Sequence, residues 1–462
     1  MLHFIPIKAL QVLQTHSPSP TCVITCYQSI DDIDTSEWEQ VVGNSNFFLK
    51  RPFLQAMEHS LQDGFLETRY AVAHDEIGKA VAVAFFQIID IKGSQNLRFK
   101  TDEAKGEDND GHPNPNQGKQ NKGKCKATQS LWRHLDPITY RAKKLLTEKV
   151  NCLEFRLLVC GNVFVTGEHG FCFCSNSIGK EQAFDLLEKM TISIVREEAL
   201  KGKTLSLTLI KDFGKDALSS ARHLAKHNFH EVKALPDLVL TMRPEWKVYD
   251  NYLQSFSSKY RVRAKGYHKK AAKLQRKYLS ADEIVEQMPI LYPLYRRVIE
   301  HADINLAYAS PQYFSIMKQY LGDDFAFWAY YLDEQPVGFI SIINAKTHTE
   351  AHLTGYDDTL NRQHAIYPNI LYDIVAQGIA WQTPEIWFGR TASEIKSTLG
   401  AEGIHLNAFV RHRHCLTNNV IAQVVNSLRQ DEWIPRHPFK EQEGKELTPI
   451  NTTTSERETK LD

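Results

Sequence analysis

Residues 161–170, GNVFVTGEHG, gather several polar side chains between flexible glycines. Glu168 and His169 can each take a proton from a reacting amine or ammonium group if the pKa of the side chain suits the pH. Asn162 and Thr166 add hydrogen-bonding groups, so this segment is a candidate lining for a cleft. A hairpin turn uses the same residue types. The sequence leaves both interpretations open.

A second pair of reactive side chains, Tyr356 and Asp357, closes a strand predicted over residues 349–356. Tyr356 is a candidate proton donor to a leaving group, and Asp357 is a candidate to bind or deprotonate an amine. The structural alternative is an aromatic core residue followed by a loop aspartate.

Two helix starts could bind an anion, because free backbone N–H groups and the helix dipole favour negative charge there. Ser177, Gly179 and Lys180 precede or open a helix predicted over residues 180–200 and supply a polar side chain, a flexible glycine and a cation. A plain helix cap would explain the same residues.

Residues 389–394, GRTASE, predict a capping box with Thr391 as N-cap and Glu394 three residues later. Arg390 just before this helix and Lys396 within it are not needed for capping. Both side chains are therefore candidates for a phosphate or carboxylate contact.

Residues 257–277 contain nine Lys or Arg side chains and no acid. On a helix, Tyr260, Ala264, Tyr267, Ala271 and Leu274 would form an apolar stripe, with cations over the rest. A solvated face usually mixes charge signs, so the run favours contact with phosphates of coenzyme A, tRNA or anionic lipid. The residues predicted to make this contact are Arg261, Arg263, Lys265, Lys269 and Lys270.

The eight cysteines are scattered, several in apolar strand-like segments, and this pattern is typical of reduced, buried thiols. Cys172 and Cys174 are one residue apart on a predicted strand, which does not match the spacing of zinc ligands. Nothing marks Cys160 or Cys172 as a nucleophile in an electropositive setting. The sequence predicts no metal site.

Strands and helices alternate around these residues, which predicts an α/β protein with mixed sheets flanked by helices. The expected elements include strands at 80–90, 163–174 and 204–210 and helices at 136–149, 249–274 and 368–381. Residues 229–242, bent at Pro236, are expected to close the first half. The 462-residue length favours two domains, and the elements after residue 245 parallel those before it in order. We expect domains at residues 1–244 and 245–440. A polar insertion at about 101–127 and the tail at 441–462 are predicted to be disordered.

Formal net charge is zero, with 55 basic and 55 acidic residues, and no DNA partner is expected. The apolar stretch at residues 80–89 carries no charge but is too short to span a bilayer. We expect a cytoplasmic protein, with peripheral contact to the inner membrane or another anionic lipid surface as an option.

Three segments, residues 156–173 (RLLVCGNVFVTGEHGFCF), 258–274 (SKYRVRAKGYHKKAAKL) and 388–401 (FGRTASEIKSTLGA), resemble bacterial GNAT-type acyltransferase families related to Fem aminoacyl transferases. The resemblance implies two tandem GNAT-like domains, acyl-CoA or aminoacyl-tRNA as donor, and an amine as acceptor. Neither half contains a recognisable form of the short glycine-rich loop with which simple acetyltransferases bind pyrophosphate. The donor contacts are then expected at Asn162, Ser177, Gly179, Lys180, Arg390 and Lys396.

The resulting hypothesis is an N-acyltransferase in which an amine attacks the thioester of acyl-CoA directly. Acyl-CoA is a co-substrate, and no tightly bound cofactor is expected. Suggested acceptors are an aminolipid or a cell-envelope precursor. The alternatives are a Fem-like transferase that uses aminoacyl-tRNA and a non-catalytic GNAT-fold binding protein.

Overall fold

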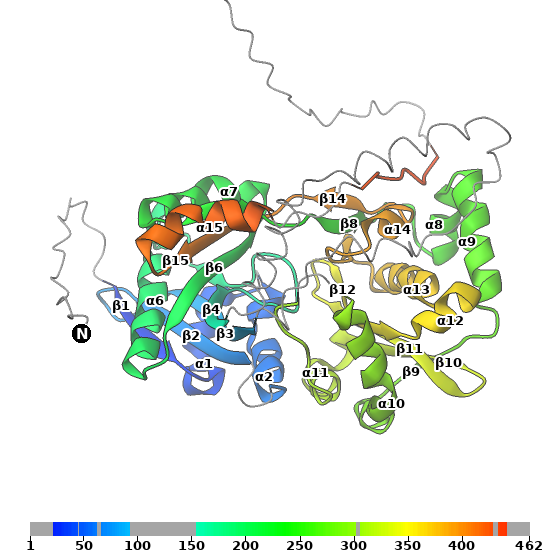
Figure 1. Ribbon diagram of the computed structural model, residues 1–462, viewed down its shortest axis with the longest axis horizontal. Coiled ribbons are helices and arrows are strands. Elements are labelled where there is room, and N and C mark those ends of the chain that lie inside the picture. The colour runs from blue at the N-terminus through cyan, green and yellow to red at the C-terminus, as the bar shows by residue number, and fades with distance from the viewer. Residues whose placement is uncertain are drawn as a thin grey trace, which may run out of the picture.

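The computed structural model describes residues 22–44, 46–61, 66–92, 154–301, 305–427 and 433–440. The protein is an α/β protein with two mixed sheets and helices on their faces, as predicted (Figure 1). The predicted insertion at 101–127, a helix expected at 136–149 and the tail at 441–462 lie outside the described residues. Within the described part of the chain, no helix is both long enough and apolar enough to cross a membrane.

The first sheet has the strand order β1-β2-β3-β4-β6-β15-β7, with β5 beside β3. Among the described strands of this sheet, only the β4–β6 pair is parallel. Parallel neighbours matter for function because their carboxyl ends meet at one edge of the sheet. The strands are β1 (Val23–Tyr27), β2 (Leu66–His74), β3 (Ala80–Lys92), β4 (Glu154–Cys160), β5 (Phe171–Phe173), β6 (Leu205–Phe213), β7 (His230–Lys233) and β15 (Asn407–His412).

Successive side chains of β2 point to opposite faces of this sheet, and the two faces pack against different helices. Ala71 and Ala73 pack in the cluster that contains the buried side of α6 (Lys180–Leu200). Tyr70 and Val72 point the other way and pack with α1 (Thr35–Val42) and α2 (Arg51–His59). Both faces are thus buried, which explains the long apolar runs in the central strands. Other helices of this half are η1 (Ile30–Asp32), η2 (Phe47–Leu49), α7 (Lys215–Ala221) and η5 (Arg222–His227), and α15 (Cys415–Ser427) packs beside β15.

The second sheet has the order β14-β8-β13-β12-β11-β10-β9, and its only parallel pair is β12–β13. One face packs with α13, α8 and α9, and the other with α10 and α11. The strands are β8 (Asp237–Thr241), β9 (Gln275–Tyr278), β10 (Phe325–Leu332), β11 (Gln335–Asn344), β12 (Thr349–Tyr356), β13 (Glu385–Trp387) and β14 (Glu402–Ile404). The helices are α8 (Tyr249–Ser255), α9 (Ser258–Lys270), α10 (Ala281–Glu300), α11 (Tyr313–Leu321), η6 (Gly322–Asp324), α12 (Asp358–His364), α13 (Ile366–Trp381) and α14 (Ser393–Ser397).

One strand from each half belongs to the sheet of the other half. β8 precedes residue 245 but pairs with β13 and β14 of the second sheet. β15 lies near the end of the chain but sits between β6 and β7 of the first sheet. Residues 229–242 therefore do not close the first half as expected, because β7 before Pro236 joins the first sheet and β8 after it joins the second. The domain boundary near 245 stays a prediction.

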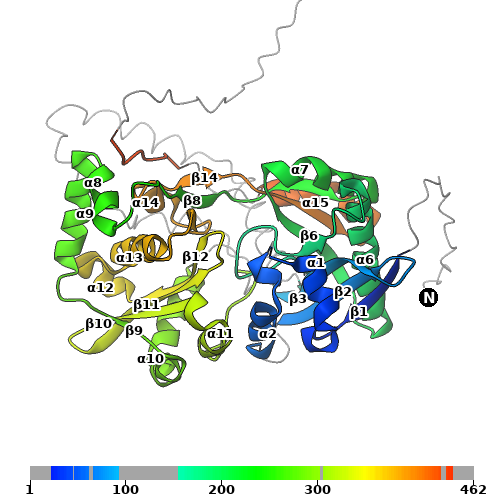
Figure 2. The same ribbon diagram turned by 180° about the vertical axis from the view of Figure 1, so that it is seen from behind.

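A shared apolar core joins the two halves. Trp38, Phe53 and Tyr70 of the first half belong to the same buried cluster as Tyr295 and Phe314 of the second. α2 packs directly against α11, and both views place these helices at the junction (Figures 1 and 2).

Three local expectations are wrong. The helix expected over 249–274 is divided into α8 and α9, and residues 275–278 form the edge strand β9. The strand expected over 163–174 is reduced to β5, since residues 161–170 form a return loop. The N-cap of α14 is Ala392 rather than Thr391, and no side chain of the described residues caps this helix.

Candidate functional site

Residues 161–170, called here the return loop, leave the end of β4 and fold back to reach β5. Their compact path requires glycine, because a Cβ on Gly170 would lie 2.5 Å from the backbone nitrogen of Gly161. Asn162 is fully buried, and its side-chain oxygen accepts a hydrogen bond from the Phe164 N–H at 2.9 Å. The loop is therefore neither a two-residue hairpin nor a freely moving connection.

Two residues at the end of β6, Lys211 and Asp212, hydrogen-bond to the backbone of the return loop. The Lys211 ammonium donates hydrogen bonds to the carbonyls of Asn162 and Val165. Asp212 has φ 73°, in the left-handed region, and its carboxylate accepts from the Gly167 N–H at 3.3 Å. Strained non-glycine conformations persist only where the surroundings enforce them, and they concentrate at functional sites.

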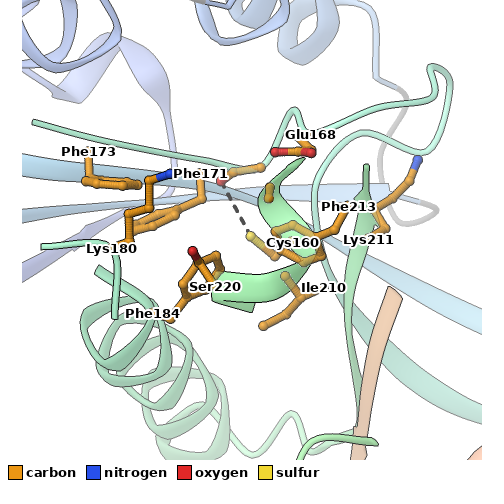
Figure 3. A pocket seen from close by; sticks show the side chains of 12 residues that line it. Cys160, Glu168, Phe171, Phe173, Lys180, Phe184, Ile210, Lys211, Phe213 and Ser220 are labelled. Atoms are coloured by element: carbon orange, nitrogen blue, oxygen red, sulfur yellow. Dashed lines mark hydrogen bonds between the residues drawn. The ribbon is translucent and has the colours of Figure 1, made fainter. Parts of the chain in front are cut away.

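A cavity of about 130 Å³ opens where the parallel strands β4 and β6 end (Figure 3). It lies between the return loop and helices α6 and α7, and β6 runs past the last paired residue of β4, Cys160. Four phenylalanines give it an apolar wall, and Glu168 and Lys180 bring charge to it. The lining is Cys160, Glu168, Gly170, Phe171, Phe173, Lys180, Phe184, Ile210, Lys211, Phe213, Ala217 and Ser220.

The N-terminus of α6 borders this cavity through Lys180 and Phe184. Among the described residues no side chain caps the first turn of α6, whose N-cap is Gly179. The Gly179 N–H itself donates to Gln182 at 3.1 Å. The N–H groups of the first turn are thus not used by a side-chain cap, and an anion contact at this helix start stays a prediction. Ser177 is exposed in the turn that precedes Gly179.

Glu168 is exposed at the cavity, and its Oε1 accepts a hydrogen bond from the Gly214 N–H at 2.9 Å. Desolvation raises the pKa of this carboxyl above its ordinary value, despite that hydrogen bond. A raised pKa brings a carboxylate closer to the pH at which it is an effective general base. The role of Glu168 as a general base stays a prediction.

His169 points away from the cavity lining. Its Nδ1 lies 3.0 Å from Asn46 Oδ1, its Nε2 lies 2.7 Å from the Thr166 carbonyl, and its ring packs on Phe48. Burial lowers the pKa of His169 to about 3. Both ring nitrogens already face oxygen atoms of the protein, so this arrangement anchors the return loop and leaves the predicted catalytic role of His169 without support.

Cys160 donates a hydrogen bond to the Gly170 carbonyl at 3.4 Å, and burial raises the pKa of its thiol. The thiolate needed for nucleophilic attack is therefore disfavoured.

Behind the return loop, three acidic and three basic side chains form a buried group, called here the central charge cluster. They are Lys211, Asp212, Asp237, Glu350, Arg390 and Lys396. β6 of the first sheet contributes two of them, and β8, β12 and the β13–α14 region of the second sheet contribute the others. The predicted residues Arg390 and Lys396 are thus brought to the return loop from more than 200 positions away in the sequence.

The ionisation of the central charge cluster is strongly biased by burial. Desolvation raises the pKa of Glu350 well above its ordinary value and lowers that of Lys396 to about 8. Arg390 forms an ion pair with Asp212, and Lys396 donates to the carbonyls of Phe388 and Gly389 at 2.6 and 3.2 Å. Arg390 and Lys396 thus already have partners within the protein, and neither side chain needs a bound phosphate to explain its position.

Several buried polar atoms of the central charge cluster have no hydrogen-bond partner among the described residues. They are both carboxylate oxygens of Asp237, Oε2 of Glu350 and Nε of Arg390. Such atoms are rare in proteins, and they require an explanation such as bound water or a role in chemistry.

Tyr356 and Asp357 are placed elsewhere. Tyr356 stacks on Tyr367 at 5.2 Å, and Asp357 is the N-cap of α12, where it accepts from the Thr359 N–H at 2.9 Å. Within the described residues no hydrogen bond or ion pair links either one to Glu168 or His169. Tyr356 therefore packs as an aromatic residue and Asp357 caps a helix, which is close to the structural alternative of a core aromatic residue followed by a loop aspartate.

The basic residues of α9 are not at the cavity. Tyr260 and Ala264 are buried, as the predicted stripe requires, and Lys265, Lys269 and Lys270 are exposed, while Arg261 and Arg263 are half-buried. α9 lies at one end of the molecule and α6 at the other (Figures 1 and 2). A ligand in the cavity would not reach this surface unless it were very long.

The sequence did not identify Lys211, Asp212, Asp237 or Glu350. A signal was present at Lys211 and Asp212, which follow the apolar strand 205–210 and precede Gly214, because a charged pair at the end of a buried strand is unusual. Asp237 and Glu350 lie inside strands and carry no local signal.

No protein-family model matches the chain, and no curated protein matches it in sequence. Solved structures do resemble it, at low identity. FemX is 10% identical with a TM-score of 0.44, covering 85% of this chain and 98% of FemX. L-PGS from Bacillus licheniformis is 11% identical with a TM-score of 0.38 (58% and 83% covered), and a GCN5-related N-acetyltransferase from Kribbella flavida is 14% identical with a TM-score of 0.30 (56% and 82% covered). These similarities concern the fold alone.

Proposed function

We propose that the protein transfers a short acyl group from acyl-CoA to an amine. The observation that carries this proposal is the apolar cavity at the carboxyl ends of β4 and β6, bordered by the uncapped N-terminus of α6. The cavity suits an acyl thioester, and the helix terminus with Lys180 suits the anionic part of the same donor.

The cavity volume sets the expected acyl length. An apolar cavity of about 150 Å³ holds one benzene molecule, so the volume of about 130 Å³ found here suits an acyl group of a few carbons. We therefore expect acetyl-CoA to bind and palmitoyl-CoA to gain nothing from its longer chain.

In the proposed reaction Glu168 takes a proton from the attacking amine. The amine nitrogen forms a bond to the thioester carbonyl carbon, the carbon–sulfur bond breaks, and the thiolate of coenzyme A leaves and is protonated. No covalent enzyme intermediate is needed, which agrees with the protonated, buried state of Cys160.

Donor binding is tested by calorimetric titration of the whole chain with acetyl-CoA, palmitoyl-CoA and free coenzyme A. We expect saturable binding of acetyl-CoA, weakened about tenfold in Lys180→Ala through loss of one charge-assisted contact. Lys189→Ala, an exposed lysine farther along α6, is the matched control and should bind normally. Absence of binding to all three ligands would refute the acyl-CoA donor and favour aminoacyl-tRNA or a non-catalytic module.

Catalysis is tested with Glu168→Gln, which keeps an oxygen to accept from the Gly214 N–H but cannot act as a base. Turnover with a panel of amines, measured by thiol release, should fall by about 100-fold or more with acetyl-CoA affinity unchanged. In the wild type the rate should fall as the pH is lowered through the raised pKa of Glu168, because the protonated carboxyl cannot accept a proton. Glu76→Gln changes an exposed glutamate and serves as the control, which should keep full activity. Full activity in Glu168→Gln as well would show that Glu168 is not the base.

A further inference from the structure

A carboxylate and two imidazoles meet between α6 and η5, outside the cavity. Asp185 comes from α6, and His223 and His227 come from η5, which continues directly from α7. Nε2 of His223 and Nε2 of His227 lie 2.8 and 2.7 Å from the same oxygen of Asp185. One ligand atom from each of the three residues lies within 4.8 Å of the other two.

The backbone that carries these histidines is fixed by other parts of the chain. Arg411 of β15 donates to the His227 carbonyl at 3.2 Å, and Asn418 of α15 donates to the Asn228 carbonyl at 2.9 Å. Both rings reach Asp185 from this short 3-10 helix, each through its Nε2. The three ligand atoms are thus preorganised by contacts that need no bound ion.

The charges favour a cation at this point. Asp185 is one carboxylate at this point, and its Oδ1 is shared by both imidazoles. A second carboxylate, Glu181, lies one turn earlier on α6, with Oε2 3.5 Å from Nδ1 of His223. A carboxylate on the far nitrogen of a histidine is the usual outer-sphere partner of a metal-bound imidazole.

We propose that Asp185, His223 and His227 bind one zinc ion, with Glu181 orienting His223. Two imidazoles and a carboxylate are a ligand set that suits zinc and other imidazole-binding transition metals better than magnesium or calcium. The Asp185 and His227 side chains are 32% and 28% exposed, so a water molecule has access to the fourth position.

The zinc ion would join the two helices that wall the cavity. α6 contributes Phe184, which directly precedes Asp185, and α7 contributes Ala217 and Ser220. The ion would therefore stabilise the cavity wall without touching the cavity. The inference does not depend on the proposed acyl transfer.

The sequence predicted no metal site, because Cys172 and Cys174, the residues nearest to zinc-ligand spacing, did not fit it. The helical segment 215–227 was not predicted, so nothing placed the two histidines beside each other. The signal that was present is His-x-x-x-His at 223–227, and the third ligand lies 38 residues before His223.

The test uses the untagged full chain, stripped of metal with a chelator and titrated with zinc chloride by calorimetry, with magnesium chloride as a separate arm. We expect one zinc ion per chain, a higher melting temperature with zinc, and no binding of magnesium. His227→Gln and Asp185→Asn should remove most of the zinc affinity. Glu181→Gln, which changes an exposed side chain, should lower the affinity by about tenfold.

The matched control is the double change His412→Gln and His414→Gln, which removes another pair of neighbouring histidines, with ring centroids 5.5 Å apart. Zinc stoichiometry should be unchanged in this variant. Circular dichroism without zinc checks that each variant is folded. The proposal is overturned if the folded wild type binds no zinc, or if binding is equal in wild type, Glu181→Gln and His227→Gln.

Discussion

Asp212 combines three costly features at one residue. It has a left-handed backbone conformation, its side chain is 1% exposed, and its carboxylate lies between two cations, Lys211 and Arg390. Coulombic attraction from these cations outweighs burial and lowers the pKa of Asp212. The ion pairs hold the end of β6 in the conformation that supports the return loop.

The change Asp212→Asn tests this role, because asparagine tolerates the left-handed conformation and keeps the size of the side chain. It leaves the buried Lys211 and the half-buried Arg390 without the carboxylate that lies between them, so urea unfolding should show a loss of about 3–5 kcal/mol. Asp324→Asn breaks the surface ion pair with Lys346 and serves as the control, with a loss of no more than about 1 kcal/mol. Equal losses in the two variants would contradict a special role for the buried pair.

At the residue scale the sequence predicted the charged residues that line the cavity better than the residues of the central charge cluster. Glu168 and Lys180 were recognised because a glycine-rich segment and a helix start are local patterns, and both residues line the cavity. Asp237 and Glu350 were missed because their importance comes from pairing across two sheets, and that pairing is set by tertiary structure. Tyr356 and Asp357 were selected from the end of a strand, but their structural partners, Tyr367 and Thr359, are local.

At the scale of elements, two glycines show how context decides the effect of one methyl group. Gly266 lies inside α9 with open space around it, so Gly266→Ala should stabilise the protein by about 0.5–1 kcal/mol. In Gly170→Ala the new Cβ would meet the backbone of Cys160 and Gly161, and the return loop would shift at a cost of about 1–3 kcal/mol. Thermal unfolding of both variants checks the opposite signs, and a stabilised Gly170→Ala would show that the loop is not tightly packed.

Most regular elements were predictable because their periodicity is strong. β3, α6 and α13 are long, with clear apolar patterns, and they appear close to their expected ranges. The edge strand β9 was not predicted, because Gln275–Tyr278 is short, polar and exposed, so nothing local distinguishes it from a loop between two helices. β5 was overextended because residues 163–165 are as apolar as a strand, although the glycines at 167 and 170 fold them into a loop.

At the scale of the whole molecule, strand exchange makes the two halves depend on each other. Removing residues 245–462 would take β15 from between β6 and β7 and would uncover the side of the shared core that contains Trp38 and Phe53. Removing residues 1–244 would take β8 from between β13 and β14. An approximate repeat in the sequence does not reveal this exchange, because the order of elements along the chain says little about which sheet each short strand joins.

We therefore expect that fragment 1–244 and fragment 245–462 do not fold separately, whereas the full chain unfolds in one cooperative transition. Exposed apolar core and unpaired strand edges would leave each fragment without a cooperative urea transition, measured by circular dichroism. Mixing the fragments during refolding should restore the transition, because β8 and β15 can then pair across the break. A fragment 1–244 that unfolds cooperatively by itself would show that β15 and the shared core add little, and the predicted boundary near residue 245 would then separate two independent folding units.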